Sequence, residues 1–131
     1  MEPATHPDPP KRHERVVLAQ AILRLFDLWG LPSADRLTLL GLSGENRSAL
    51  QRYARGEPLA ASRDLLDRGG HLLGIHKSLK LLYPRNEDLV RGWMSSPNER
   101  FGGETPVEVV RRFGLPGIVM VRGTLDVMRG H

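Results

Sequence analysis

The sequence contains no cysteine, few aromatic residues and no long apolar run. Without cysteine, the chain forms neither disulfides nor thiolate metal sites. No apolar segment approaches the roughly 20 residues that a membrane-spanning helix needs. The N-terminal residues also lack the apolar core of a signal peptide. We therefore expect a cytoplasmic protein that has no membrane partner.

The sequence also lacks the alternating apolar pattern of strands, and it has no internal repeat. Of its 131 residues, 40% are hydrophobic, which is ordinary for a globular protein. Helix start and stop signals recur along the chain instead. The sequence therefore predicts an all-α fold.

A dense basic tract is missing as well. The formal net charge is +4, but the basic residues are spread along the whole chain. A protein that binds nucleic acid through bulk charge would concentrate them. Any DNA binding must therefore depend on where individual side chains lie.

Residues typical of catalysis do not stand in a recognisable arrangement. The segment Gly69–Gly74 is rich in glycine, but Lys77 is out of place for a phosphate-binding loop and no strand precedes it. His71 and His76 lie on different faces of a helix rather than around one metal ion. We predict no catalytic residues, no metal site and no cofactor, and hence not an enzyme.

Segments with different composition and helix signals divide the chain. Residues 1–10 are rich in proline and are expected to form a disordered lead-in. Residues 11–60 contain several short helices, residues 61–84 form a long connecting helix, and residues 85–131 form a C-terminal domain. The first helix is apolar on most of its circumference, which is typical either of a subunit interface or of a helix at the centre of a monomer.

Two short helices joined by a glycine-containing turn form a helix-turn-helix layout. They are expected over residues 34–40 and 47–55. Leu50 and Tyr53 are spaced to face the core, which leaves polar side chains on the opposite face. Such side chains can contact phosphates and base edges, so we predict DNA contacts at Arg47, Ser48, Gln51, Arg52 and Arg55.

Gly69, Gly70 and Gly74 lie inside the long helix, which Ser62 is expected to cap. Each glycine weakens a helix interior by about 1 kcal/mol relative to alanine. They indicate either a kink or a close crossing of two helices. After this helix, Trp93 is expected to be a core residue, because a large aromatic side chain in a short apolar helix is more often buried than exposed.

Two capped helices follow. Thr105 begins the first with a capping box, and Gly114 ends it. The spacing of Val107, Val110 and Phe113 predicts its buried face. In the terminal helix, apolar residues with helical spacing are predicted to face inward: Ile118, Val121, Leu125 and Met128. The charged residues are predicted to form an outward row with an i,i+4 ion pair at its start: Arg122, Asp126 and Arg129.

The C-terminal pattern W-M-x-x-P-N-x-x-F-G-G-x-T-P-V-E-V-V, followed by G-L and V-x-x-x-L-D-x-x-R-G, resembles the toxin-binding domain of the Xre/MbcA/ParS antitoxins. The resemblance covers Arg91 to Gly130, and its ending is most similar to the MbcA branch. The earlier segment LGLS…ALQRYARGEPL resembles the Xre-type DNA-binding fold. There, the turn is longer than the family pattern by the residues Gly44 to Asn46. A longer turn re-aims the recognition helix, or leaves the helix-turn-helix as a scaffold only.

The resemblance implies an antitoxin whose partner is a RES-domain toxin that consumes NAD. It implies inhibition by the terminal helix, which would cover the NAD pocket. It also implies operator DNA as a further partner, repression of the antitoxin's own operon, and an oligomer of this chain alone or with the toxin. The alternatives are a DNA-binding regulator whose C-terminal domain only dimerises, and an adaptor for polar protein localisation as in the ParS-like branch.

The predicted toxin contacts lie at the end of the terminal helix. An NAD pocket is built to hold a pyrophosphate and therefore attracts cationic groups, and a glycine allows close approach of the backbone. The candidate toxin-binding residues are Arg122, Asp126, Arg129, Gly130 and His131.

Overall fold

The computed structural model describes residues 8–130 of the chain. All of its regular elements are helices, so the all-α prediction is confirmed for the described part of the chain. The α-helices are α1 (Arg12–Leu28), α2 (Ser33–Leu40), α3 (Arg47–Ala54), α4 (Arg63–Leu82), α5 (Glu87–Gly92), α6 (Pro106–Phe113) and α7 (Leu115–Met128). Three short 3-10 helices connect them: η1 (Gly44–Asn46), η2 (Trp93–Ser95) and η3 (Glu99–Phe101).

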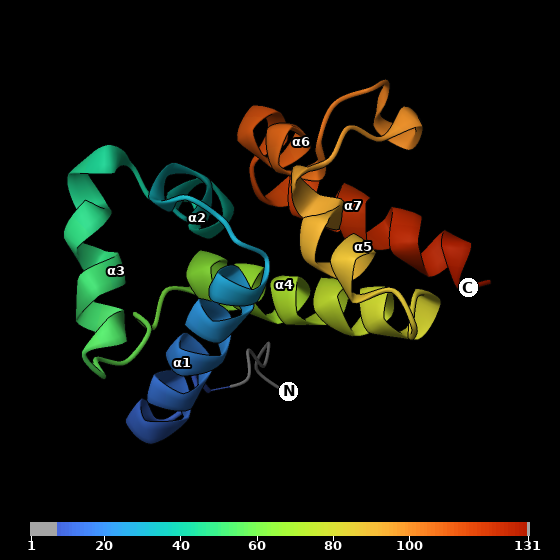
Figure 1. Ribbon diagram of the computed structural model, residues 1–131. Helices are drawn as coiled ribbons and strands as arrows, with labels where there is room; N and C mark the ends of the chain where they lie inside the picture. The colour runs from blue at the N-terminus through green and yellow to red at the C-terminus, as the bar shows by residue number, and fades with distance from the viewer. Residues whose placement is uncertain (1–7, 131) are drawn as a thin grey trace, which may run out of the picture.

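The long helix α4 is the element that the two halves of the molecule share. In Figure 1, α1, α2 and α3 lie around its beginning, on the left, and α5, α6 and α7 lie above its later part, on the right. It contacts α1 and α2 on one side and α5 and α7 on the other. The buried residues of both halves form a single cluster that extends from α1 to α7. Because the two halves share this core, we treat them as one packed unit.

The helix ends follow the signals in the sequence. The side chains of Ser62 and Asn86 each accept a hydrogen bond from the backbone N–H three residues later, at 3.3 Å and 3.1 Å. Thr105 and Glu108 form the predicted capping box at the start of α6. The backbone N–H of Thr105 donates to the carboxylate of Glu108, and this hydrogen bond, followed by the interaction with the Thr105 side chain, lowers the pKa of Glu108. Gly114 ends α6 with φ of 67°, a value that favours glycine.

Helix α1 packs against α3 and α4. Ile22 and Phe26 are completely buried against the core. Apart from Val17, which is 63% exposed, the apolar residues of α1 are buried or partly buried, as the apolar circumference predicts. The subunit interface and the central helix of a monomer both stay predictions for this helix.

The glycines of α4 mark close helix crossings. At Gly69, an added Cβ would lie 2.8 Å from the Cδ1 atom of Ile22 in α1. At Gly74, an added Cβ would lie 2.5 Å from the guanidinium carbon of Arg122 in α7. The helix runs without interruption through all 20 residues. The close-crossing prediction is confirmed at Gly69 and Gly74, which let α1 and α7 approach the same helix. At Gly70, which is exposed, an added Cβ would meet nothing within 4 Å, so the prediction is wrong there.

Candidate functional site

The terminal helix α7 is held against α4 and α6. Ile118, Val121 and Leu125 are completely buried, as predicted, and Met128 is partly buried. Gly117 lies so close to α6 that an added Cβ would stand 2.7 Å from the carbonyl oxygen of Val109. Any larger residue would collide with backbone there. The position of α7 on α6 is therefore fixed by a glycine.

The charged row of α7 does not face outward as predicted. The Nη1 atom of Arg122 lies 3.0 Å from the Nδ1 atom of His71 in α4. The Nη1 atom of Arg129 donates to the hydroxyl of Ser78, also in α4, at 3.1 Å. Within the described residues, Arg122 and Asp126 form no ion pair, so that prediction is wrong too. The long side chain of Arg122 reaches the neighbouring helix because Gly74 leaves room for it.

The outer face of α7 is apolar instead. Val119 and Met120 are each about half exposed, and Val127 is 66% exposed. Gly123 lies between them in the sequence, and an added Cβ there would meet nothing within 4 Å. We call Val119, Met120, Gly123 and Val127 the outer face. Its signal in the sequence was a second apolar stripe, together with the absence of charge from the first seven residues of the helix.

The end of α6 differs from the prediction as well. Val107 and Val110 are buried as expected, but Phe113 is 46% exposed and the guanidinium of Arg112 lies over its ring. The buried position is taken by Val109, which α7 covers at Gly117. The prediction for Phe113 is wrong because Gly114 turns the chain directly after it. This turn leaves a further large apolar side chain at the surface.

The residues before α6 stabilise the C-terminal half rather than forming an open site. Trp93 is buried, as predicted, and its ring meets the ring of Phe101 edge-on at 6.3 Å. Asn98 closes the following loop: its backbone N–H donates to the carbonyl of Glu104, and its carbonyl accepts from the N–H of Gly103. The motif residues in this segment therefore have structural roles.

The helix-turn-helix region consists of α2, η1 and α3. Tyr53 is buried and Leu50 partly buried, as predicted. The segment Gly44–Asn46, where the turn is longer, forms η1. The predicted polar residues lie at the surface of α3, and Arg52 is the least exposed of them. Four of them are exposed: Arg47, Ser48, Gln51 and Arg55.

Arg52 is occupied by contacts within this region. Its Nη1 atom donates to the hydroxyl of Ser48 at 2.8 Å, and its Nε atom lies 3.3 Å from the carboxylate of Glu57. Arg52 is therefore held by neighbouring side chains, whereas Arg47 and Arg55 are more exposed.

A buried arginine that the sequence analysis missed joins α4 to the end of α2. Arg68 of α4 pairs with Asp64 at 2.8 Å and donates to the carbonyl groups of Thr38 and Leu39, at the end of α2. Its guanidinium occupies the space that a side chain at Gly41 would need. A cation at a helix C-terminus is favourable. The signal in the sequence was limited to the i,i+4 spacing of Asp64 and Arg68.

Comparisons with known proteins place these elements in a family. Residues 13–74 match the antitoxin Xre-like helix-turn-helix domain. Residues 78–130 match the antitoxin Xre/MbcA/ParS C-terminal toxin-binding domain. This chain belongs to the Xre/MbcA/ParS antitoxin family. It is also 32% identical over 112 residues to the uncharacterised protein y4oB of Sinorhizobium fredii, an alignment that covers 85% of this chain and 83% of that protein.

Both matched segments of the antitoxin include part of α4. The helix-turn-helix match ends within α4 and the toxin-binding match begins within it. In the toxin-binding segment, the outer face of α7 leads to Gly130, which is exposed; the predicted contact His131 lies outside the described residues. Across residues 8–130, no helix is long and apolar enough to cross a membrane.

Proposed function

We propose that this antitoxin acts in the cytoplasm by inhibiting a RES-domain toxin that consumes NAD, and that it belongs to the MbcA-like branch. The antitoxin would bind the toxin through α7 and cover its NAD pocket. The observation that carries this proposal is the outer face of α7, which presents apolar side chains to solvent inside a toxin-binding domain. Exposed apolar surface of this kind is typical of protein–protein contacts.

The outer face is suited to a protein partner rather than to solvent. A helix of a lone domain normally turns a polar face outward. In α7 the arginines turn toward α4 and leave Val119, Met120 and Val127 at the surface. Their burial against a partner would remove apolar area from water, at roughly 25 cal/mol for each Å². The apolar contact would then provide most of the affinity for the toxin, and the end of α7 would be positioned at the NAD pocket.

The end of α7 would reach into the toxin's pocket. Arg129 lies one residue before Gly130, and both stand close to the end of the helix. Release of Arg129 from Ser78 would cost only a hydrogen bond between partly buried groups, about 1 kcal/mol. Its guanidinium can then bind where the pyrophosphate of NAD would lie, with Gly130 and His131 beside it. Asp126 would contact charges at the pocket mouth, and Arg122 would join it after leaving His71.

The test is a matched pair of charge insertions. Val127→Glu places a carboxylate on the outer face of α7, and Val17→Glu places one on α1 at a valine of similar exposure, 66% and 63%. With the purified toxin and NAD, the Val127→Glu variant should fail to inhibit NAD consumption, whereas the Val17→Glu variant should inhibit it like the unmodified chain. Equal inhibition by both variants would exclude α7 as the inhibitory surface.

Deletion of Arg129 to His131 tests the pocket-filling step separately. Arg129 and Gly130 do not belong to the buried core, so the melting temperature should change little. The truncated chain should still bind the toxin through the outer face but should inhibit NAD consumption less. Full inhibition by the truncated chain would mean that the helix end does not enter the pocket.

DNA binding by α3 is a second activity that we propose, in which the antitoxin represses its own operon. The supporting observation is the exposed polar face of α3, with Arg47, Gln51 and Arg55 directed away from the core. An Arg52→Ala, Arg55→Ala double variant should bind promoter DNA more weakly. The slope of log affinity against log salt should also become shallower, by up to about 0.9 for each phosphate that the variant no longer neutralises. Unchanged affinity and slope would place the DNA-binding surface elsewhere or leave α3 as a scaffold.

A further inference from the structure

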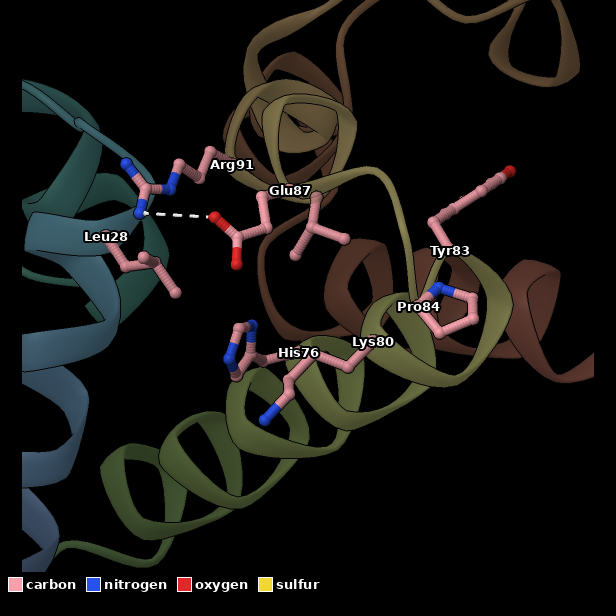
Figure 2. A pocket seen from close by; sticks show the side chains of 8 residues that line it. Leu28, His76, Lys80, Tyr83, Pro84, Glu87 and Arg91 are labelled. Carbon is pink, nitrogen blue, oxygen red and sulfur yellow. Dashed lines mark ion pairs between the residues drawn. The ribbon is translucent and has the colours of Figure 1, made fainter.

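A cleft of about 320 Å³ lies between the two halves of the molecule. Leu28 at the end of α1 forms one side (Figure 2). His76 and Lys80 of α4 lie below it, and Glu87 and Arg91 of α5 lie above it. Pockets that hold small ligands range from about 300 to 1,000 Å³ and occur preferentially where domains meet. The cleft is therefore large enough for a guest with a single ring.

Unpaired polar atoms adjoin this cleft. The Nε1 atom of Trp29 and the Nδ1 atom of His76 are the buried side-chain nitrogens or oxygens without a hydrogen-bond partner in residues 8–130. The two rings meet edge-on with their centroids 6.1 Å apart, so the two unpaired nitrogens lie on neighbouring side chains. Native proteins pair almost all buried polar groups. Of these two residues, His76 lines the cleft, and Trp29 lies behind it against the His76 ring.

The charges around the cleft favour an anionic guest. Lys80 and Arg91 contribute positive charge and Glu87 contributes negative charge. The pair of Arg91 and Glu87 is long, at 4.0 Å, and both side chains are exposed, so it holds Arg91 only weakly. Burial, and to a smaller extent Lys80, lowers the pKa of His76 and keeps its ring neutral at pH 7. A neutral imidazole can donate one hydrogen bond without adding charge.

We propose that this cleft binds a small organic carboxylate with an apolar ring. The ring of the guest would lie between Leu28, Tyr83 and Val90, and its carboxylate would face Lys80 and Arg91. The apolar wall sets the size of the guest and the cationic rim sets its charge. This site is separate from the outer face of α7 and does not depend on toxin binding.

Benzoate is the probe, and the two tryptophans supply the readout. In a nitrogen–proton correlation spectrum of the full chain, each indole N–H gives its own signal, and Trp93→Phe identifies which signal belongs to Trp29. Added benzoate at millimolar concentration should shift the Trp29 signal in a saturable manner and leave the Trp93 signal in place, because Trp29 contacts His76 at the cleft. Benzamide has the same shape without the charge and should bind more weakly.

Two lysines of α4 provide the matched variants. Lys80 lines the cleft, whereas Lys77 is exposed on the same helix and does not line it. Lys80→Gln should weaken benzoate binding about two- to five-fold, the effect of an exposed charge pair, and Lys77→Gln should leave it unchanged. The proposal is overturned if the Trp29 signal does not shift or does not saturate. Equal binding of benzamide, or equal weakening by both lysine variants, overturns it as well.

Discussion

Helices α3 and α7 both contain arginines, but they expose different kinds of side chain to solvent. Both carry arginines that the spacing of apolar residues predicted to face outward. On α3 this prediction holds, and Arg47, Gln51 and Arg55 are exposed. On α7 the arginines turn to α4 and the exposed residues are valine and methionine. The outward face of a helix therefore depends on its neighbours as well as on its own pattern.

The physical reason lies in the number of neighbours. Helix α3 has its main helix contact with α1, so the polar side chains opposite that contact face solvent. Helix α7 has α4 on one side and α6 on another. Its arginines are long enough to reach partners on α4, where His71 and Ser78 accept them beside Gly74. A polar face suits solvent or nucleic acid, whereas an apolar face suits a protein partner.

The largest effect on stability is expected when the buried tryptophan of the C-terminal half is removed. Trp93→Ala should destabilise the protein by about 3–5 kcal/mol, because the large ring is buried against Phe101. Trp93→Phe should cost less, since an aromatic ring remains. Thermal unfolding followed by circular dichroism measures both. If Trp93→Ala melts normally but fails to bind the toxin, Trp93 belongs to the interface with the toxin and not to the core.

The glycines of α4 offer a sharper test of how α7 is held. Gly69→Ala forces Ile22 to move within the packed core, whereas Gly74→Ala meets only the flexible end of Arg122. The replacement of glycine by alanine raises the helix propensity equally in both variants, so this contribution cancels when their free energies of unfolding are compared. Gly69→Ala should therefore be less stable than Gly74→Ala by about 1–3 kcal/mol. Equal stabilities in urea unfolding would show that Arg122 is held as firmly as a core side chain.

A direct comparison of one arginine from each helix should give a smaller effect. Arg122→Ala removes a hydrogen bond to a partly buried histidine and should cost about 1 kcal/mol. Arg47→Ala removes an exposed side chain on α3 and should change stability by less than about 0.5 kcal/mol. Chemical unfolding of both variants under the same conditions measures the difference. Equal costs would contradict the distinction between the arginines of α3 and those of α7.

The smallest expected effect is a pH dependence of the stability that arises from His76 of α4. Burial lowers the pKa of His76 below its ordinary value of 6.5. Protons therefore bind the unfolded chain more readily. The stability from neutral His76 is present above pH 6.5 and is lost as pH falls through the lowered pKa. His76→Gln should flatten the fall in melting temperature over that window, and an unchanged profile would assign the fall to other groups.

Local signals accounted for much of the fold. Ser62 and Thr105 begin helices where their side chains predicted it, and Gly114 ends one. These effects act within one helical turn, so a short stretch of sequence contains them. The prediction that Phe113 is buried is wrong for a related reason. Its spacing matches the apolar face of α6, but the chain turns at Gly114 directly after it, and the ring stays exposed.

The candidate site divides in the same way. The sequence by itself determined the helices, their caps, the buried stripe of α7 and the family motifs, because each depends on residues a few positions apart. Only the tertiary structure decided where Arg122, Arg129 and Arg68 point, because their partners lie about thirty or fifty positions away in the chain. Long, flexible side chains settle wherever a polar partner and free space coincide, and packing alone creates that space.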